Sequence, residues 1–156
     1  KKEEKEAGFS LVELLIVVII MGILAAIAIP LFMSQRAKAE DKHAQADVRT
    51  LATEISTFYA DSDTSTKIEV DLTNHQYTIK EVGGATVTTT PASKNVTMAR
   101  IVLPTSGTSY HDRWCVAVAN PKGNVKAYSM SADKGLKEST DGMGFAGLDC
   151  APATGT

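Results

Sequence analysis

The chain has 156 residues, of which 22% are charged, and its net charge is −2. A nearly neutral chain without a basic stripe gives no positive reason to expect nucleic acid as a direct ligand. Two cysteines and three histidines without zinc-type spacing predict no metal site, and we expect no cofactor.

A charged block opens the chain and ends in a small residue. Three lysines balance three glutamates within residues 1–6, and Ala7 and Gly8 follow. Three further cations, at positions 36, 38 and 42, lie beyond the next apolar segment. Because orientation in a membrane follows the Lys and Arg counts on each side of a span, charge alone does not orient this segment.

The apolar run from Phe9 to Met33 contains only two polar side chains, Ser10 and Glu13. A helix of this length, rising about 1.5 Å per residue, measures roughly 37 Å and exceeds a hydrocarbon core of about 30 Å. We predict a membrane helix rather than the core helix of a globular protein, because the remaining chain has no comparable apolar layer to cover it. A carboxylate in such a span costs roughly 2.5–3.5 kcal/mol, so Glu13 needs a partner and is a candidate functional residue.

A cleaved secretory signal is the alternative interpretation of this run. The sequence from Ala26 to Ala28 fits an A-x-A-like cleavage site, and a cut there would release a domain that starts at Ile29. The run is longer than the about 7–15 residues of a usual signal core, and it contains a carboxylate. Pro30 also lies just past the supposed cut.

Two residues weaken the predicted helix. Pro30 cannot donate a hydrogen bond to the carbonyl of Ala26, so we expect a kink or a loosened turn there. Gly22 is about 1 kcal/mol poorer than alanine inside a helix.

The sequence Gly8-Phe-Ser-Leu-Val-Glu-Leu-Leu15, followed by Gly22-Ile-Leu-Ala-Ala-Ile-Ala-Ile-Pro30, resembles the processing and assembly segment of type IV pilins. The resemblance covers about residues 7–36, roughly a fifth of the chain. A softer continuation through residues 30–36 and 51–54 resembles pilins of Gram-positive bacteria.

This resemblance implies specific roles for these residues. A prepilin peptidase would cut after Gly8 and methylate the new amine of Phe9. Glu13 would pair with the N-terminal amine of a neighbouring subunit during assembly. The helix between Gly22 and Pro30 would be able to extend when the fibre stretches, or Gly22 would simply allow close helix packing.

Beyond Met33 the sequence becomes mixed, and helical spacing continues. Apolar residues recur every three or four positions at Val48, Leu51, Ala52, Ile55, Phe58 and Tyr59. The helix is therefore expected to continue to about Ala60, and the polar stretch at 61–66 reads as a turn. The second half of the helix would be an amphipathic spine.

Alternating β-branched and aromatic residues predict strands in the rest of the chain. They fall at 68–72, 77–79, 96–103, 114–119 and 125–130, and the last two are joined by the turn Asn120-Pro-Lys-Gly-Asn124. We predict an α+β fold in which a long N-terminal helix packs against a small antiparallel sheet.

Cys115 and Cys150 are expected to form a disulfide if the head lies outside the cytoplasmic membrane, and two free thiols are the alternative. The bond would tie the Gly- and Asp-rich tail, residues 133–149, back to the sheet. That tail otherwise lacks core-forming residues.

Three further clusters fit ordinary surface chemistry better than a site. Ser106, Ser109, His111 and Asp112 have hydrolase residue types, but no G-x-S-x-G elbow accompanies them, so no catalytic residue is assigned. Asp133, Asp141 and Asp149 lack the spacing of a calcium loop. Asn95-Val-Thr97 fits a glycosylation sequon, which is a weak signal.

The sequence thus predicts five segments: a leader at 1–8, a transmembrane or filament-core half helix at 9–33, an amphipathic half helix at 34–60, a head with its preceding loop at 61–131, and a disulfide-tied tail at 132–156. The expected function is that of a structural type IV pilus subunit and not an enzyme. Its partners would be other pilin subunits, the prepilin peptidase, the assembly machinery and the cytoplasmic membrane before assembly, with an extracellular filament as its final location. A minor pilin or a secretion or competence pseudopilin is the alternative, followed by a membrane-anchored or secreted binding protein.

Overall fold

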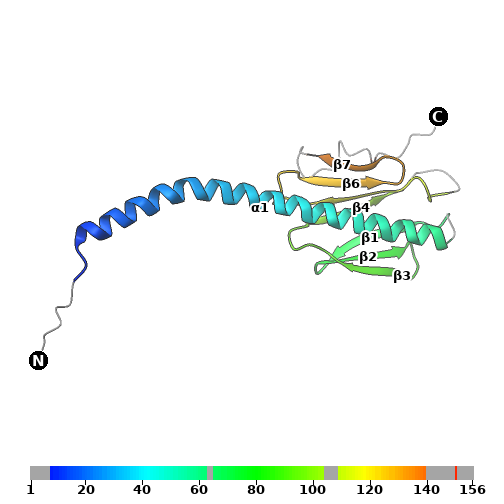
Figure 1. The fold of residues 1–156 in the computed structure, drawn as a ribbon. Helices are drawn as coiled ribbons and strands as arrows, with labels where there is room; N and C mark the ends of the chain where they lie inside the picture. The colour runs from blue at the N-terminus through cyan, green and yellow to red at the C-terminus, as the bar shows by residue number, and fades with distance from the viewer. Residues whose placement is uncertain (1–7, 63–64, 104–108, 140–149, 151–156) are drawn as a thin grey trace, which may run out of the picture. The chain divides into compact units, whose positions relative to one another are not determined.

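The computed structural model describes residues 8–62, 65–103, 109–139 and 150. The chain divides into two units, Lys1–Arg36 and Ala37–Thr156. The helix α1, Leu11–Asp61, belongs to both units and is continuous through Gly22 and Pro30 (Figure 1). It ends one residue later than the sequence predicted.

The second half of α1 forms the spine of the head, as predicted. Its buried apolar residues include the whole predicted stripe together with Ala44. These side chains join one hydrophobic core with residues of both sheets, among them Tyr77, Val116, Val118 and Tyr128. Removing this stripe from water is what holds the helix against the strands.

The strands of the head form two antiparallel sheets, where the sequence predicted one. Strand order is β1-β2-β3 in the first sheet and β4-β5-β6-β7 in the second, and the two sheets contact each other through β1 and β4 (Figure 1). The strands are β1 Ile68–Thr73, β2 Gln76–Glu81, β3 Thr86–Pro91, β4 Met98–Val102, β5 Cys115–Ala119, β6 Ala127–Ser131 and β7 Gly135–Ser139.

Two of these strands were missed by the sequence analysis, β3 and β7. Each is an outer strand of its sheet, so neither needs a fully apolar face. β3 is largely exposed threonine, and β7 has a single large apolar residue, Leu136, which packs against the core. The prediction that the tail after residue 132 lacks core-forming residues was therefore wrong for its first part.

The turns between strands use backbone conformations that fit tight hairpins. Asn74 and His75 both have positive φ, 51° and 57°, and connect β1 to β2 with a two-residue loop. This is the pattern of a type I′ turn, whose twist matches that of the strands. Gly135 has a φ of 70° at the start of β7.

Candidate functional site

The N-terminal turn of α1 is closed by two reciprocal hydrogen bonds. The Ser10 N–H donates to Oε2 of Glu13 at 2.9 Å, and the Glu13 N–H donates to Oγ of Ser10 at 3.4 Å. This is a capping box, S-x-x-E, with Ser10 as the N-cap and Glu13 three residues on. The pair satisfies two backbone donors that the first turn of a helix otherwise leaves open.

Glu13 therefore has a partner inside its own chain, which the sequence analysis did not foresee. The signal was available, because Ser10-Leu-Val-Glu13 fits the capping-box pattern. A backbone N–H does not neutralise the carboxylate, and Oε1 of Glu13 accepts no hydrogen bond from the described residues. One oxygen of Glu13 holds the helix start, and the other is open to a second donor.

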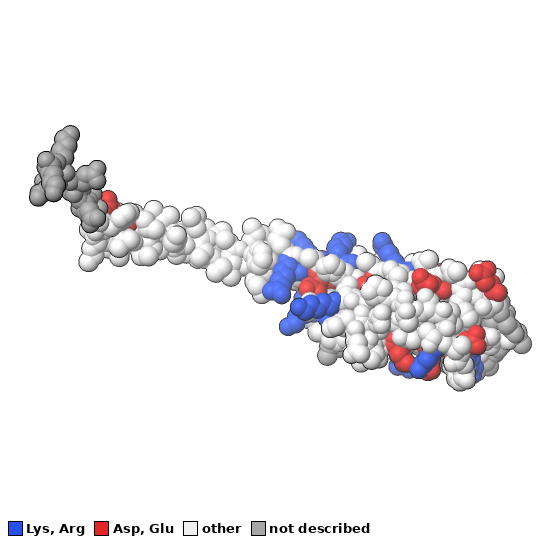
Figure 2. All heavy atoms as spheres, turned by 90° about the horizontal axis from the view of Figure 1, so that it is seen from below, with Lys and Arg blue, Asp and Glu red and all other residues white. Residues whose placement is uncertain are grey.

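The apolar half of α1 exposes its side chains all round. Large hydrophobic residues from Leu11 to Met33 are between 45% and 79% exposed, and none of the most apolar window, of mean hydropathy 3.1, is buried within the chain. Figure 2 shows this part of the helix free of charged atoms except near its start. By length and composition this helix is able to cross a membrane.

The other predicted residues of this segment make no side-chain contact within the described part of the chain that would assign them a role. Gly8 and Phe9 directly precede the capping box, and Phe9 is 78% exposed. A Cβ added at Gly22 would meet no atom within 4 Å, so nothing in a single chain requires glycine there. Residues 1–7 lie outside the described residues.

A second group of carboxylates, on the helix within the head, fastens the loops between strands. Asp47 is buried and accepts three hydrogen bonds, from the Tyr77 hydroxyl at 2.6 Å, from Oγ of Ser93 at 2.7 Å and from the Ser93 N–H at 2.8 Å. Burial, together with the hydrogen bond to Asp47 and its charge, raises the pKa of the Tyr77 phenol far above its usual range. The phenol therefore stays a hydrogen-bond donor at any physiological pH.

Glu40 lies two turns earlier on the helix and binds two loops at once. Its Oε1 accepts from Nδ2 of Asn95 at 2.6 Å, and its Oε2 accepts from Nδ2 of Asn120 at 3.2 Å. Asn95 is the acceptor residue of the sequon noted in the sequence. Its amide nitrogen is already bound, so modification there would first have to break this bond.

Asp41 fastens the turn between β5 and β6. Its Oδ1 accepts from the Val125 N–H at 3.0 Å. A Cβ built on Gly123 would overlap this oxygen, so the close approach of turn and carboxylate favours glycine here. The sequence marked residues 120–124 as a turn, and the contact with Asp41 explains its composition.

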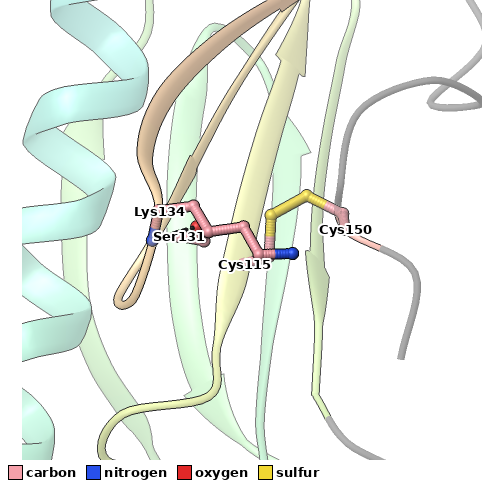
Figure 3. Close-up of a disulfide and its surroundings, with 4 residues drawn as sticks. All are labelled: Cys115, Ser131, Lys134 and Cys150. Atoms are coloured by element: carbon pink, nitrogen blue, oxygen red, sulfur yellow. Dashed lines mark hydrogen bonds between the residues drawn. A yellow bond between two sulfur atoms is a disulfide. The ribbon is translucent and has the colours of Figure 1, made fainter. Parts of the chain in front are cut away.

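Cys115 and Cys150 form a disulfide, with their Cα atoms 5.3 Å apart. Figure 3 shows Cys115, at the start of β5, joined to Cys150. On the opposite side of Cys115 lies Ser131, its cross-strand partner, whose Oγ accepts from the Lys134 N–H at 3.1 Å. The bond links β5, an inner strand, to the C-terminal part of the chain.

Among the described residues, those with hydrolase side chains do not assemble into a catalytic site. His111 and Asp112 line an open groove of about 650 Å³ together with Arg49 and Trp114. Oγ of Ser109 accepts from the backbone N–H of His111 at 3.4 Å and makes no hydrogen bond to an imidazole among the described residues. Ser106 lies outside the described residues, as do Asp141 and Asp149 of the acidic tail. In the described part of the chain no three potential ligands come together for a metal ion.

Comparisons with known proteins point to the N-terminal segment. The family model for the prokaryotic N-terminal methylation motif matches residues 5–29. The chain is 42% identical over 59 residues to the type IV major pilin protein PilA of Myxococcus xanthus, an alignment that covers 38% of this chain and 27% of that protein. It is 58% identical over 36 residues to the fimbrial protein EcpB of Eikenella corrodens, covering 23% of each chain.

One similarity extends over most of the chain. The type II secretion system core protein G of Dickeya chrysanthemi is 24% identical over 146 residues, which covers 91% of this chain and 87% of that protein. No solved structure matches the chain. These relatives are named as pilins, fimbrial proteins and secretion-system core proteins rather than enzymes, in agreement with the predicted structural role. The chain thus carries a prokaryotic N-terminal methylation motif and is similar to type IV pilin, fimbrial and type II secretion core proteins, most strongly in its N-terminal segment.

Proposed function

We propose that the chain is a structural subunit of a type IV pilus, held in the cytoplasmic membrane by the apolar half of α1 before it joins an extracellular filament. The observation that supports this most is the methylation motif at residues 5–29, on a helix whose apolar side chains are exposed all round. A surface of that kind needs lipid or the same surface of other subunits to cover it. Other pilin subunits and the assembly machinery are the partners that this function requires.

The processing steps follow from the same motif. A prepilin peptidase cuts after Gly8 and methylates the amine of Phe9. The new amine lies one residue before the capping box of Ser10 and Glu13. We propose that the open oxygen of Glu13 binds the amine of a neighbouring subunit, while its other oxygen keeps the bond to Ser10. Pairing the charges inside an apolar bundle would favour the correct axial register, because an unpaired buried charge costs about 3–5 kcal/mol.

The structure suggests two substitutions that separate capping from charge. Glutamine also serves in a capping box, so Glu13→Gln keeps the helix start and removes the charge. Glu13→Ala removes both. If pairing with the amine matters, both variants enter the membrane and both fail to reach normal filament yield. A normal filament yield from Glu13→Gln would mean that Glu13 only caps the helix and that its charge is not needed for assembly.

Processing is tested by the intact mass and N-terminal peptides of the protein from its native host. A chain that starts at N-methyl-Phe9 supports the proposal. A chain that starts at Ile29 would mean an ordinary secretory signal and a secreted domain, and would refute it. A chain that keeps residues 1–8 in the membrane and never enters a filament would indicate a membrane-anchored binding protein.

A secretion or competence pseudopilin, or a minor pilin, is the second candidate. The observation that favours it is the similarity to the Dickeya secretion protein over nearly the whole chain. The two functions differ in how much of the assembled filament consists of this chain. Long purified filaments composed mainly of it support the major pilus subunit, whereas its presence only in short filaments or at trace levels supports the pseudopilin or minor pilin.

A further inference from the structure

One end of the head carries a set of lysines, which we call the lysine collar. Figure 2 shows Lys and Arg side chains gathered over one end of the head. Lys38 and Lys42 lie on the helix where the head begins, and both are exposed. The collar consists of Lys38, Lys42, Lys94, Lys122 and Lys126, of which only Lys126 is half-buried.

Loops from distant parts of the sequence reach this end because the helix holds them there. Lys94 lies between Ser93 and Asn95, which are bound to Asp47 and Glu40. Lys122 lies in the turn that Asn120 and Val125 fasten to the helix, through the Glu40 carbonyl at 3.1 Å and Asp41 at 3.0 Å. The collar is therefore part of the folded head and not a property of the helix alone.

The carboxylates at the same end are used by other partners. Those of Glu40, Asp41 and Asp47 are the loop fasteners and accept from amide, hydroxyl and backbone donors. A fourth, Glu138, accepts from Nε2 of Gln45 at 3.1 Å. By contrast, no ion pair between a collar lysine and a carboxylate is found among the described residues. Lys126 donates to the carbonyls of Pro121 and Gly123, and Lys42 donates to Oε1 of Gln45. The collar thus keeps its positive charge unpaired by carboxylates in the described part of the chain, and four of its five lysines are exposed.

We propose that the lysine collar binds the anionic headgroups of the membrane that the apolar half of α1 spans before assembly. The inference rests on the proposed membrane anchoring. The apolar run ends at Met33, and five residues reach at most about 18 Å, so Lys38 lies close to the headgroups however the head is oriented. Basic residues next to a span are attracted to anionic lipid by an amount that corresponds to about a fivefold gain in binding per residue.

The collar would hold the head down on the lipid surface with its opposite end facing away. Because the attraction acts between exposed charges, it weakens as salt shortens the Debye length from about 8 Å at physiological ionic strength. Removing three lysines should lower the equilibrium constant for docking of the head on the lipid surface by on the order of a hundredfold. A head that is mostly docked then becomes mostly free.

The experiment places the full chain in nanodiscs, one copy in each, with a gadolinium chelate on a small fraction of the lipid headgroups. Paramagnetic broadening is measured for the methyl signals of Val125, beside the collar, and of Val82, which follows β2 near the opposite end. Nanodiscs of phosphatidylcholine alone are compared with nanodiscs that contain phosphatidylglycerol. The collar variant is Lys38→Gln/Lys42→Gln/Lys122→Gln. The control has the same charge change at the opposite end, Lys67→Gln/Arg113→Gln/Lys134→Gln.

The expected result is stronger broadening of Val125 than of Val82 in anionic nanodiscs, reduced by 0.5 M NaCl, abolished in the collar variant and kept in the control variant. Equal broadening in both lipids, or equal loss in both variants, would overturn the proposal. If the collar instead serves contact with an acidic surface of a second copy, single-copy nanodiscs show no lipid-dependent difference, and the proposal fails.

Resistance of the chain to alkaline extraction from the same nanodiscs is scored separately. A chain that is extracted refutes membrane anchoring itself, whereas an anchored chain without the Val125 effect refutes the collar alone.

Discussion

Asp47 is the residue whose loss should cost the head most among its polar side chains. It accepts hydrogen bonds from the Tyr77 hydroxyl and from both donors of Ser93. Hydrogen bonds to a charged acceptor contribute about 1.5–3 kcal/mol each, and a buried donor left without a partner costs about 1–3 kcal/mol. Relief of a buried charge and the better helix propensity of alanine offset part of this. We therefore expect Asp47→Ala to lower the unfolding free energy by about 4 kcal/mol.

The measurement is urea unfolding of the full chain in detergent micelles, followed by the fluorescence of the buried Trp114. Glu54→Ala is the matched control, because Glu54 lies on the same helix and accepts no hydrogen bond from the described residues. It should change the unfolding free energy by less than about 0.5 kcal/mol.

A double-mutant cycle with Tyr77→Phe identifies the interaction that is lost. Because the two side chains share a 2.6 Å hydrogen bond in the core, their effects should be non-additive by about 1.5 kcal/mol or more. Additive effects, or an Asp47→Ala variant as stable as the Glu54→Ala control, would refute the view that this carboxylate fastens the loops to the helix.

Three further predictions concern the head. Replacing Cys115 and Cys150 together with alanine should lower the unfolding free energy by about 4 kcal/mol in the chain-entropy model for a separation of 35 residues, and the same urea titration under reducing conditions should give the wild-type chain a matching loss. Gly123→Ala should cost about 1–3 kcal/mol because the new Cβ displaces the carboxylate beneath it, whereas Gly22→Ala, which meets no neighbour, should leave the stability of the head unchanged. Burial raises the pKa of Tyr128 to about 12 from 10, so the stability that its protonated form contributes is complete below pH 10 and is lost as the pH rises toward 12. Between pH 10 and 12 the unfolding free energy of the wild type should therefore fall more steeply than that of Tyr128→Phe, by about 1 kcal/mol per pH unit. Parallel pH profiles would contradict this.

The long helix and most strands could be predicted because their patterns are strong. The stripe from Val48 to Tyr59 and the alternating runs around β1 and β2 each place apolar side chains on one buried face, and β5 is an apolar run that is buried throughout. The division into two sheets could not be predicted, since it depends on the long-range contact of β1 with β4. β3 escaped notice because threonines on an outer strand carry little burial signal.

The candidate site was predicted unevenly for a similar reason. The resemblance predicts roles for Gly8, Phe9 and Glu13, and these roles stay predictions. The hydrogen bond between Ser10 and Glu13 follows instead from the local sequence Ser-Leu-Val-Glu, which fits a capping box. The loop fasteners Glu40, Asp41 and Asp47 carry no sequence signal. Charged residues on an amphipathic helix usually face water, and only the fold brings amide and hydroxyl donors to them.

The disulfide also determines how the molecule would carry a mechanical load. A pull between the helix and the residues that follow Cys150 passes through the sulfur atoms to Cys115 at the start of β5. The 34 residues between the cysteines, which include β5 after Cys115 as well as β6 and β7, are bypassed and bear none of the tension. Breaking the bond would place that stretch in the line of force and release about 120 Å of additional chain length. The disulfide thus limits how far a subunit can extend under tension before its core strands separate.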